Sequence, residues 1–326
     1  MPSAAGDFGV RSDVEPWVRI GFLNGGLGDD LGRVPRGSEE GGAGCIGFVP
    51  FGQAVRENLV MAAVVVLAYV VLNRVLDVEG AGGGRKKAVY VGRPNSAVDT
   101  ALGVLSAVVW VWNASYKMAK SRFIFMLAPC HVLSLMHAFV LLNRPSAAWN
   151  RLFLLSIAWQ YGAVMAILTP DTANLYMPGE VLEFFAQHWL ITVIVPPYLI
   201  FSRREENAAF LGNQPWEFLR GILSMQAFHW FILGPVGRLM HANLNYMQCP
   251  PELVWDISDM GVHPILNDAQ GYRLVTSLIV VPMSAIVYLA YWGVCYALPG
   301  LLLPPQAKPS AGKGRATRGS STKKSR

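Results

Sequence analysis

The sequence is poor in charge for its length. Only 15% of the 326 residues are Asp, Glu, Lys or Arg, whereas 53% are hydrophobic. A soluble domain usually carries about a quarter charged residues. Here the apolar residues gather in long runs, and the mean hydropathy is +0.35. These properties exclude an ordinary soluble domain and predict a polytopic membrane protein.

Other signals are missing as well. The N-terminus lacks the basic and then apolar pattern of a cleaved signal peptide, so we expect the first apolar span to serve as the signal. The segment GGLGDDLG at 25–32 follows no apolar strand and precedes no helical pattern, so we do not interpret it as a phosphate loop. The sequence therefore predicts neither a bound cofactor nor a nucleic-acid partner.

The two ends of the chain differ from the middle in composition. Residues 1–50 are mostly Gly, polar and acidic, whereas residues 301–326 hold seven Lys or Arg residues and no acid. Such segments cannot bury enough apolar surface to fold, so we predict that both are disordered. The basic tail also accounts for the net charge of +6 and could contact anionic lipid headgroups. We assign the residues between these ends, 51–300, to the membrane domain.

Seven segments of this domain are long and apolar enough to cross a hydrocarbon core of roughly 30 Å at about 1.5 Å per helical residue. They cover approximately 54–76, 97–118, 123–143, 149–168, 180–201, 215–238 and 273–299. The third and sixth are the least apolar. NAS at 113–115 fits the glycosylation pattern, but it lies within or against the second span and is not expected to be modified. The predicted fold class is all-α, a polytopic membrane protein with about seven transmembrane helices.

The distribution of Lys and Arg predicts how the spans are oriented. Alternate connections carry Arg85, Lys86, Lys87 and Arg93, then Arg144 and Arg151, then Arg203 and Arg204, and finally the basic tail. The opposite connection at 117–122 is also basic and argues against this assignment, with Lys117, Lys120 and Arg122. The sum of the charges places the C-terminus in the cytoplasm and the N-terminus in the lumen or outside the cell.

Polar residues of three spans converge at one depth in this topology. Cys130 and His131 in the third span lie about 10–12 Å from its lumenal end. Gln187 and His188 in the fifth reach a similar depth, and His229 in the sixth lies roughly 12 Å deep. Ionisable residues at such depth usually face a cavity or a partner. A lone membrane His or Cys is often a structural packing residue, but the convergence favours a functional site.

Cys130 is the candidate nucleophile of this site. Pro129 should kink or break the third span, and if a new helix begins there, its N–H groups would favour a thiolate at Cys130. A thiolate beside an imidazole can take an acyl group as a thioester. His188 is the first choice for the general base, and His229 is the second.

Further residues could assist this chemistry. Ser134 and His137 share a helix face with Cys130 by i, i+4, i+7 spacing, and we expect His131 and His137 to orient groups or to shuttle protons. His131 projects about 100° around the helix from Cys130, so it is the weaker partner for direct pairing. Gln187 and Ser134 are candidate substrate contacts. Zinc binding by one Cys and four His is an alternative, although no pair has the spacing of HExxH or of repeated His boxes.

The long connection at 239–272 contains HANLNYMQCP and offers further candidates. Asn243 and Asn245 could bind a headgroup or stabilise an oxyanion, or they could cap backbone groups in a turn. Cys249 in this connection and Cys45 both fall on the lumenal side, where a disulfide is chemically possible. Sequence alone does not establish that the two are close.

Three segments carry a family resemblance. LAPCHVLSLMHAFVLL at 127–142, EFFAQHWLITVIVPPYLIF at 183–201 and FHWFILGPVGRLMHANLNYMQCP at 228–250 resemble the transmembrane protein 164 family. The likeness runs from about residue 45 to 299, and its members are seven-span membrane acyltransferases that build ether phospholipids with polyunsaturated chains. The family's catalytic Cys falls on Cys130. Its other polar motif positions fall on His131, His137, Gln187, His188, His229, Asn243, Asn245 and Cys249.

The resemblance implies acyl transfer without free coenzyme A, from a donor phospholipid through Cys130 to a lysophospholipid that could be ether-linked. The implied partners are membrane phospholipids and lysophospholipids, with no cofactor and no obligatory protein partner, in the endoplasmic reticulum or Golgi. No HxxxxD acyltransferase box occurs within the predicted spans, which agrees with a Cys-dependent route; HPILND at 263–268 fits the pattern but lies in the long connection. The alternative is a non-catalytic lipid-binding receptor or transporter, which the confinement of polarity to the lumenal half disfavours.

Overall fold

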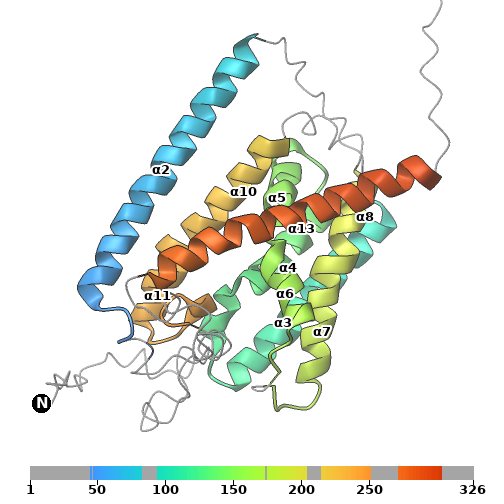
Figure 1. The fold of residues 1–326 in the computed structure, drawn as a ribbon. Coiled ribbons are helices and arrows are strands. Elements are labelled where there is room, and N and C mark those ends of the chain that lie inside the picture. Colours follow the sequence, from blue (N-terminus) through green and yellow to red (C-terminus); the bar gives the residue numbers. More distant parts are fainter. Residues whose placement is uncertain are drawn as a thin grey trace, which may run out of the picture.

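Figure 1 shows a bundle of helices with one long helix, α2, standing to one side. The computed structural model describes residues 45, 47–82, 94–172, 175–203, 214–250 and 271–302. Every regular element in these ranges is helical, so the all-α prediction is confirmed. The elements are α2 (Phe51–Gly82), α3 (Ala97–Ala119), η2 (Phe123–Leu127), α4 (Pro129–Leu142), α5 (Ala147–Ala158), α6 (Gln160–Leu168), α7 (Glu180–Trp189), η3 (Leu190–Ile194), α8 (Val195–Ser202), α10 (Gln214–Phe228), η4 (His229–Leu233), α11 (Gly234–Leu239), η5 (Leu244–Tyr246) and α13 (Tyr272–Leu302).

The described ranges contain four or five candidate membrane spans rather than a clear set of seven. The four that are long and apolar enough are Phe51–Val75, Ala97–Ala119, Glu180–Ser202 and Tyr272–Gly293. A fifth results if α5 and α6, which meet at an angle of 43°, form one span. The third predicted span is divided before Pro129, which leaves an α4 of 14 residues. The sixth is divided by a π-helical turn, so the count of seven stays a prediction.

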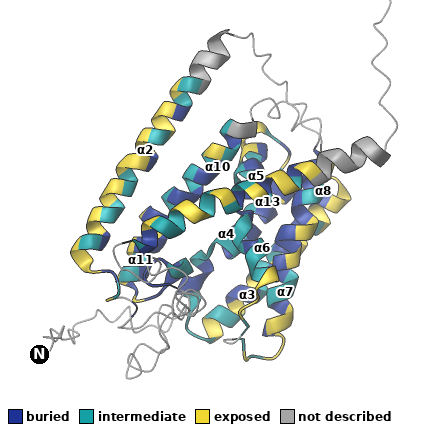
Figure 2. Ribbon diagram, viewed as in Figure 1, coloured by how far each residue is buried: buried dark blue, intermediate teal, exposed yellow. Residues whose placement is uncertain are grey.

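α2 and α13 expose most of their apolar side chains. Only 11% of the most apolar window of either helix is buried, against 50% for the span Glu180–Ser202. In Figure 2 both helices are coloured mainly as exposed or intermediate. Leu59 on α2 and Leu278 on α13 are 66% and 63% exposed. Lipid tails are as apolar as leucine, so these two helices form walls that face the bilayer.

The centre of the bundle is packed around α4, α5 and α8. Val140, Leu141 and Phe153 are fully buried and belong to one cluster that reaches η3 and α8. Small residues let helices in a membrane approach closely. A Cβ at Gly103 on α3 would lie only 2.8 Å from the Leu142 side chain. This close contact sets how α3 is rotated against α4, and therefore which of its polar residues face α4.

Two prolines explain two widened helical turns. Pro196 and Pro235 have no backbone N–H, and in a regular α-helix their rings collide with the carbonyl four residues earlier. The turns before them, η3 and η4, are π-helical. The freed carbonyl of Thr192 accepts a hydrogen bond from the Tyr291 hydroxyl at 2.7 Å. Turns of this kind are frequent at functional sites, and η4 begins at the candidate base His229.

Buried polar groups hold one end of the bundle together. Asp99 forms a capping box with Ser96 at the start of α3 and accepts a hydrogen bond from the Tyr198 hydroxyl at 3.1 Å. Arg203, just after α8, lies 3.9 Å from the same carboxylate and donates to the Val140 carbonyl at 2.9 Å. These contacts fasten α3, α4 and α8 at a common level.

An ion pair and a disulfide hold the opposite end. Lys120 follows α3 and pairs with Glu180 at the start of α7, and both side chains are buried. Cys45 and Cys249 form a disulfide across 204 residues, which joins the segment before α2 to the loop after α11. The structure thus bonds the two cysteines whose proximity the sequence left open.

Candidate functional site

Cys130 lies in the first turn of α4, directly after Pro129. Pro129 occupies the first helical position, where a missing N–H breaks no helical hydrogen bond, and η2 ends just before it. Of the two outcomes predicted at Pro129, a kink or a break, the structure shows the break, and a new helix begins there. Pro129 has no N–H, and the N–H groups of His131 and Val132 donate to the Ala128 carbonyl at 3.0 and 3.2 Å, so it is the dipole of α4 that favours a thiolate in this turn. Cys130 is half-buried, and its sulfur is a thiol that is not part of a disulfide.

The imidazole of His131 lies beside the Cys130 sulfur. The distance between Nδ1 of His131 and Sγ of Cys130 is 3.8 Å. The sequence ranked His131 as the weaker partner because adjacent residues diverge by about 100° around a helix. The divergence does not keep the two apart, since Nδ1 lies close to the backbone within the ring and reaches back along the first turn to the preceding side chain. The ranking of His131 below His188 stays a prediction.

Gln187 on α7 ties this pair to a second helix. Its amide nitrogen lies 2.8 Å from Nδ1 of His131 and donates to the Ser134 hydroxyl at 2.9 Å. The Ser134 hydroxyl donates in turn to the Cys130 carbonyl oxygen at 3.1 Å. Gln187, His131 and Ser134 are all buried. The third and fifth predicted spans thus meet at the residues that the sequence singled out.

α3 contributes a residue that the sequence analysis missed. The Asn113 amide nitrogen donates to the Gln187 oxygen at 3.2 Å and to a Glu183 carboxylate oxygen at 2.8 Å. Because Asn113 holds the Gln187 oxygen, the Gln187 nitrogen is left to face His131. In the sequence, Asn113 stood out only as part of a glycosylation pattern. The available signal was its i, i+4 spacing to Lys117, which puts both on one side of α3.

Lys117 adds a positive charge to this site. It interacts electrostatically with His131, His188 and Glu183. Its ammonium nitrogen lies 5.8 Å from the centre of the Phe125 ring. An ammonium group at this position can attract a phosphate or offset negative charge that develops on an ester oxygen.

The hydrogen bonding of His188 suits a general base. Its Nδ1 lies 2.7 Å from the Phe184 carbonyl oxygen, to which it donates because a carbonyl has no proton to give. The Nε2 of the neutral ring then carries the lone pair, and no other described residue forms a hydrogen bond with it. His188 is also close enough to His131 for their charges to interact.

Unlike His188, His229 has both of its ring nitrogens hydrogen-bonded to protein groups. Its Nδ1 donates to the Met225 carbonyl at 2.8 Å, and its Nε2 accepts a hydrogen bond from the Asn245 amide at 2.7 Å. Asn245 also hydrogen-bonds the Tyr161 side chain and has a left-handed φ of 48°. Nε2 of His229, the second choice for the general base, therefore already accepts a hydrogen bond. Asn245 is the residue that donates it.

Asn243 fits the turn-capping alternative. Its side-chain oxygen accepts from the backbone N–H groups of Gln248 at 2.9 Å and Cys249 at 3.2 Å. Its amide nitrogen donates to the Cys249 carbonyl at 3.1 Å. The residue is fully buried and holds the turn that carries one end of the disulfide.

His137 lies apart from the hydrogen-bonded network of Cys130, His131, Ser134 and Gln187. It is fully buried, and its Nε2 lies 3.1 Å from the Ser156 hydroxyl on α5. The i, i+7 spacing puts His137 on the face of Cys130, but at this level that face of α4 meets α5 instead of α7. Among the described residues, no group of three or more His, Cys, Asp and Glu side chains is arranged to hold a metal ion.

Residues 44–291 match the TMEM164 family. This range covers most of the chain and contains every residue of the network around Cys130. The chain belongs to the TMEM164 family. The Transmembrane protein 164 homolog of Dictyostelium discoideum is 27% identical over 163 residues, which are 48% of this chain and 56% of that protein. The chain thus spans little more than half the length of this curated relative. No solved structure matches.

The TMEM164 match confirms the resemblance that the three sequence segments carry. It begins one residue before Cys45 and ends within α13, so it includes both cysteines of the disulfide. The first 43 residues and the basic tail lie outside it. The predictions of disorder for 1–50 and 301–326 fall almost wholly outside the described residues.

Proposed function

We propose that this TMEM164 family protein is a membrane-embedded, Cys-dependent phospholipid acyltransferase that needs no cofactor. The observation that carries the proposal is Cys130 in the first turn of α4, with Nδ1 of His131 at 3.8 Å from its sulfur. A cysteine thiol beside an imidazole at a helix N-terminus is the arrangement of an activated thiol nucleophile. The apolar walls of α2 and α13 keep the protein among phospholipids, whose esters are suitable donors.

In the first half of the reaction, the Cys130 sulfur attacks the carbonyl carbon of a phospholipid ester. A carbon–sulfur bond forms, the ester carbon–oxygen bond breaks, and the acyl group is held as a thioester. Nε2 of His188 takes the thiol proton and passes it to the departing lysophospholipid oxygen. His131 orients the thiol, and Lys117 offsets the charge that develops on the ester oxygen.

In the second half, the hydroxyl of an acceptor lysophospholipid attacks the thioester. His188 takes the proton of this hydroxyl, the new ester forms, and the carbon–sulfur bond breaks. The proton returns to the Cys130 sulfur, so the enzyme is restored. The acyl group moves from one lipid to another without coenzyme A. An acceptor with an ether-linked chain presents the same hydroxyl and enters by the same step.

The proposal includes seven passes through the membrane. Two further helical stretches could each cross: η2 with α4 over 123–142, and α10 with η4 and α11 over 214–239. Disulfides persist in oxidising compartments, so the Cys45–Cys249 bond supports a lumenal position for this end and a cytoplasmic C-terminus. The opposing charge at 117–122 is reduced because Lys120 pairs with Glu180. The expected membrane is the endoplasmic reticulum or Golgi.

The test is intact mass spectrometry of the purified full chain after incubation with phosphatidylcholine, compared with Cys130→Ser. We expect a hydroxylamine-sensitive fatty-acyl adduct on the native protein and none on the variant. Turnover without an adduct would replace the thioester by direct transfer. If neither an adduct nor turnover were seen, the acyltransferase proposal would give way to the alternative, a non-catalytic lipid-binding receptor or transporter.

The role of His188 is tested separately by two histidine variants. His188→Gln should slow formation of the acyl adduct by about 100-fold or more, because it removes the proton acceptor. His137→Gln is the matched control, since His137 is also a buried imidazole of a membrane helix but contacts Ser156 on α5. A normal rate of acylation in His188→Gln would exclude His188 as the base.

A further inference from the structure

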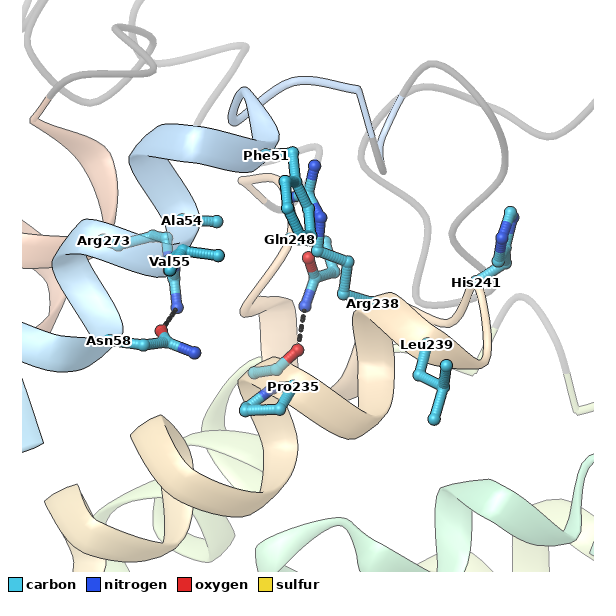
Figure 3. Close-up of a pocket in the computed structure, with 11 residues that line it drawn as sticks. Phe51, Ala54, Val55, Asn58, Pro235, Arg238, Leu239, His241, Gln248 and Arg273 are labelled. Carbon is cyan, nitrogen blue, oxygen red and sulfur yellow. Dashed lines mark hydrogen bonds between the residues drawn. The ribbon is translucent and has the colours of Figure 1, made fainter. Parts of the chain in front are cut away.

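A cavity of about 570 Å³ lies between α2, α11 and the start of α13 (Figure 3). Its lining combines the polar residues Asn58, Arg238, His241, Gln248 and Arg273 with apolar residues of α2 and α11. None of the lining residues belongs to the network of Cys130, His131 and Gln187. The cavity is therefore a second feature that the proposed acyl transfer does not use.

Arg273 is the buried charge of this cavity. Its guanidinium donates to Glu57 at 3.1 Å and to Asn58 at 2.6 Å, and the guanidinium carbon lies 4.4 Å from the centre of the Trp230 ring. Its Nε–H is buried and has no hydrogen-bond partner among the described residues. A buried donor without an acceptor is rare in folded proteins and often marks a place where a ligand supplies the acceptor.

Arg238 brings a second guanidinium from α11. Its Nη1 donates to the Val49 carbonyl at 2.9 Å, and its guanidinium carbon lies 5.4 Å from the centre of the Phe51 ring. No carboxylate in the described ranges pairs with Arg238. Glu57 forms a salt bridge with Arg273 and so balances only that guanidinium. The cavity therefore has a net positive charge, which comes from Arg238.

His241 stands at the rim and contributes little charge at neutral pH. The residue as a whole is exposed, but its ring is partly desolvated by its surroundings. That desolvation, and then the charge of Arg238, lower the pKa of His241 below its ordinary value. The two arginines therefore define the electrostatics of the cavity.

The mouth of the cavity is apolar. Phe51, Val55 and Leu239 line it and are 69%, 40% and 74% exposed. The exposed apolar face of α2 continues from this mouth along the helix, for example at Leu59. A basic floor therefore adjoins an apolar wall. A phospholipid has the same division, with a phosphate at the membrane interface and acyl chains below it.

We propose that this cavity binds the phosphate group of one phospholipid. The phosphate oxygens accept hydrogen bonds from Arg238 and from the free Nε–H of Arg273, because a guanidinium presents a fork of donors that matches phosphate. The acyl chains lie along Phe51, Val55 and Leu239. Soluble phosphate shares the headgroup chemistry, but it would make no use of the apolar mouth.

The test measures binding of three probes by native mass spectrometry of the delipidated full chain in a maltoside detergent. The probes are dioctanoylphosphatidylglycerol, dioctanoylglycerol without a phosphate, and sodium phosphate. All chains carry Cys130→Ser, so acyl transfer cannot alter the lipid and the result does not depend on the proposed function. We expect one tightly bound dioctanoylphosphatidylglycerol, no bound dioctanoylglycerol, and much weaker binding of sodium phosphate.

Two arginine variants decide whether the lipid occupies this cavity. Arg238→Gln should raise the Kd for dioctanoylphosphatidylglycerol about ten-fold, which corresponds to the loss of one charged hydrogen bond. Arg56→Gln is the matched control, because Arg56 is exposed on the same helical turns of α2 and does not line the cavity. An unchanged Kd in Arg238→Gln, or an equal loss in both variants, would overturn the proposal.

Further outcomes are equally decisive. Leu239→Glu places an acid at the exposed mouth without touching the core, so it should weaken binding even if Arg238→Gln does not fold. Unchanged binding in Leu239→Glu would also overturn the proposal. Sodium phosphate that binds as tightly as the lipid would assign the cavity to soluble phosphate instead.

Discussion

The amide nitrogen of Gln187 lies 2.8 Å from Nδ1 of His131 and joins α7 to the first turn of α4. Since an amide nitrogen only donates, Nδ1 accepts, and the proton of the neutral His131 ring sits on Nε2. Asn113 holds the Gln187 oxygen from the other side. Gln187 is thus a positioning residue that fixes the ring of His131 beside the Cys130 sulfur.

The first prediction concerns Gln187→Leu. This substitution leaves the buried acceptors of His131 and Ser134 without their donor, so the free energy of unfolding should fall by about 1–3 kcal/mol. Acylation of Cys130 should slow by roughly 100-fold, because the imidazole beside the sulfur is no longer held in place. Thermal unfolding in detergent and the time course of the acyl adduct measure the two effects.

Gln160→Leu is the matched control for this prediction. Gln160 is fully buried like Gln187, but neither polar atom of its side chain has a hydrogen-bond partner among the described residues. Its replacement by Leu should leave stability unchanged or raise it, and acylation should proceed at the native rate. If both substitutions had the same effects, Gln187 would have no special role in positioning His131.

The second prediction tests the polar cluster at the other end of α3. Asp99 is fully buried, caps α3 with Ser96, accepts from Tyr198 and faces Arg203. Asp99→Asn removes the charge that these groups share, so stability should fall by about 1.5–3 kcal/mol. Tyr198→Phe removes one hydroxyl and should have a smaller effect. If Tyr198→Phe were the more harmful, the carboxylate charge would not be the centre of this cluster.

Several parts of the site could be predicted from sequence because they depend on local rules. Pro129 marked the start of α4, since proline fits the first helical turn and not the interior. Counting turns from the span ends brought Cys130, His131 and Gln187 to one level, and the structure joins them by hydrogen bonds. Depth along a helix follows from residue number alone, at about 1.5 Å per residue.

Rotation about a helix axis could not be predicted in the same way. Asn113 reaches Gln187 because α3 packs against α4 at Gly103, and this packing is tertiary. The same reason separates His137 from Cys130, since α5 approaches that level of α4. Hydropathy also could not predict how the third and sixth spans are divided, because summed apolarity does not register the break before Pro129 or the π-helical turn at η4.

The third prediction compares two glycines. A Cβ at Gly221 on α10 would collide with the Ala158 Cβ of α5, so Gly221→Ala forces the helices apart and should cost about 1–3 kcal/mol of stability. At Gly162 on α6 nothing lies within 4 Å of the added atom, and Gly162→Ala should raise stability by about 0.5–1 kcal/mol through helix propensity. Thermal unfolding of both variants gives the comparison. Equal shifts would mean that α10 and α5 are not in close contact.

The fourth prediction concerns the disulfide between Cys45 and Cys249, which closes a loop of 204 residues in sequence separation. The bond restricts the unfolded chain, so Cys249→Ser should lower the free energy of unfolding by about 2–4 kcal/mol. Native protein and Cys130→Ser should change mobility on gels when a reductant is added, whereas Cys249→Ser should not. Loss of the shift in Cys130→Ser would mean that Cys130 is itself disulfide-bonded, and a bonded sulfur could not serve as the nucleophile.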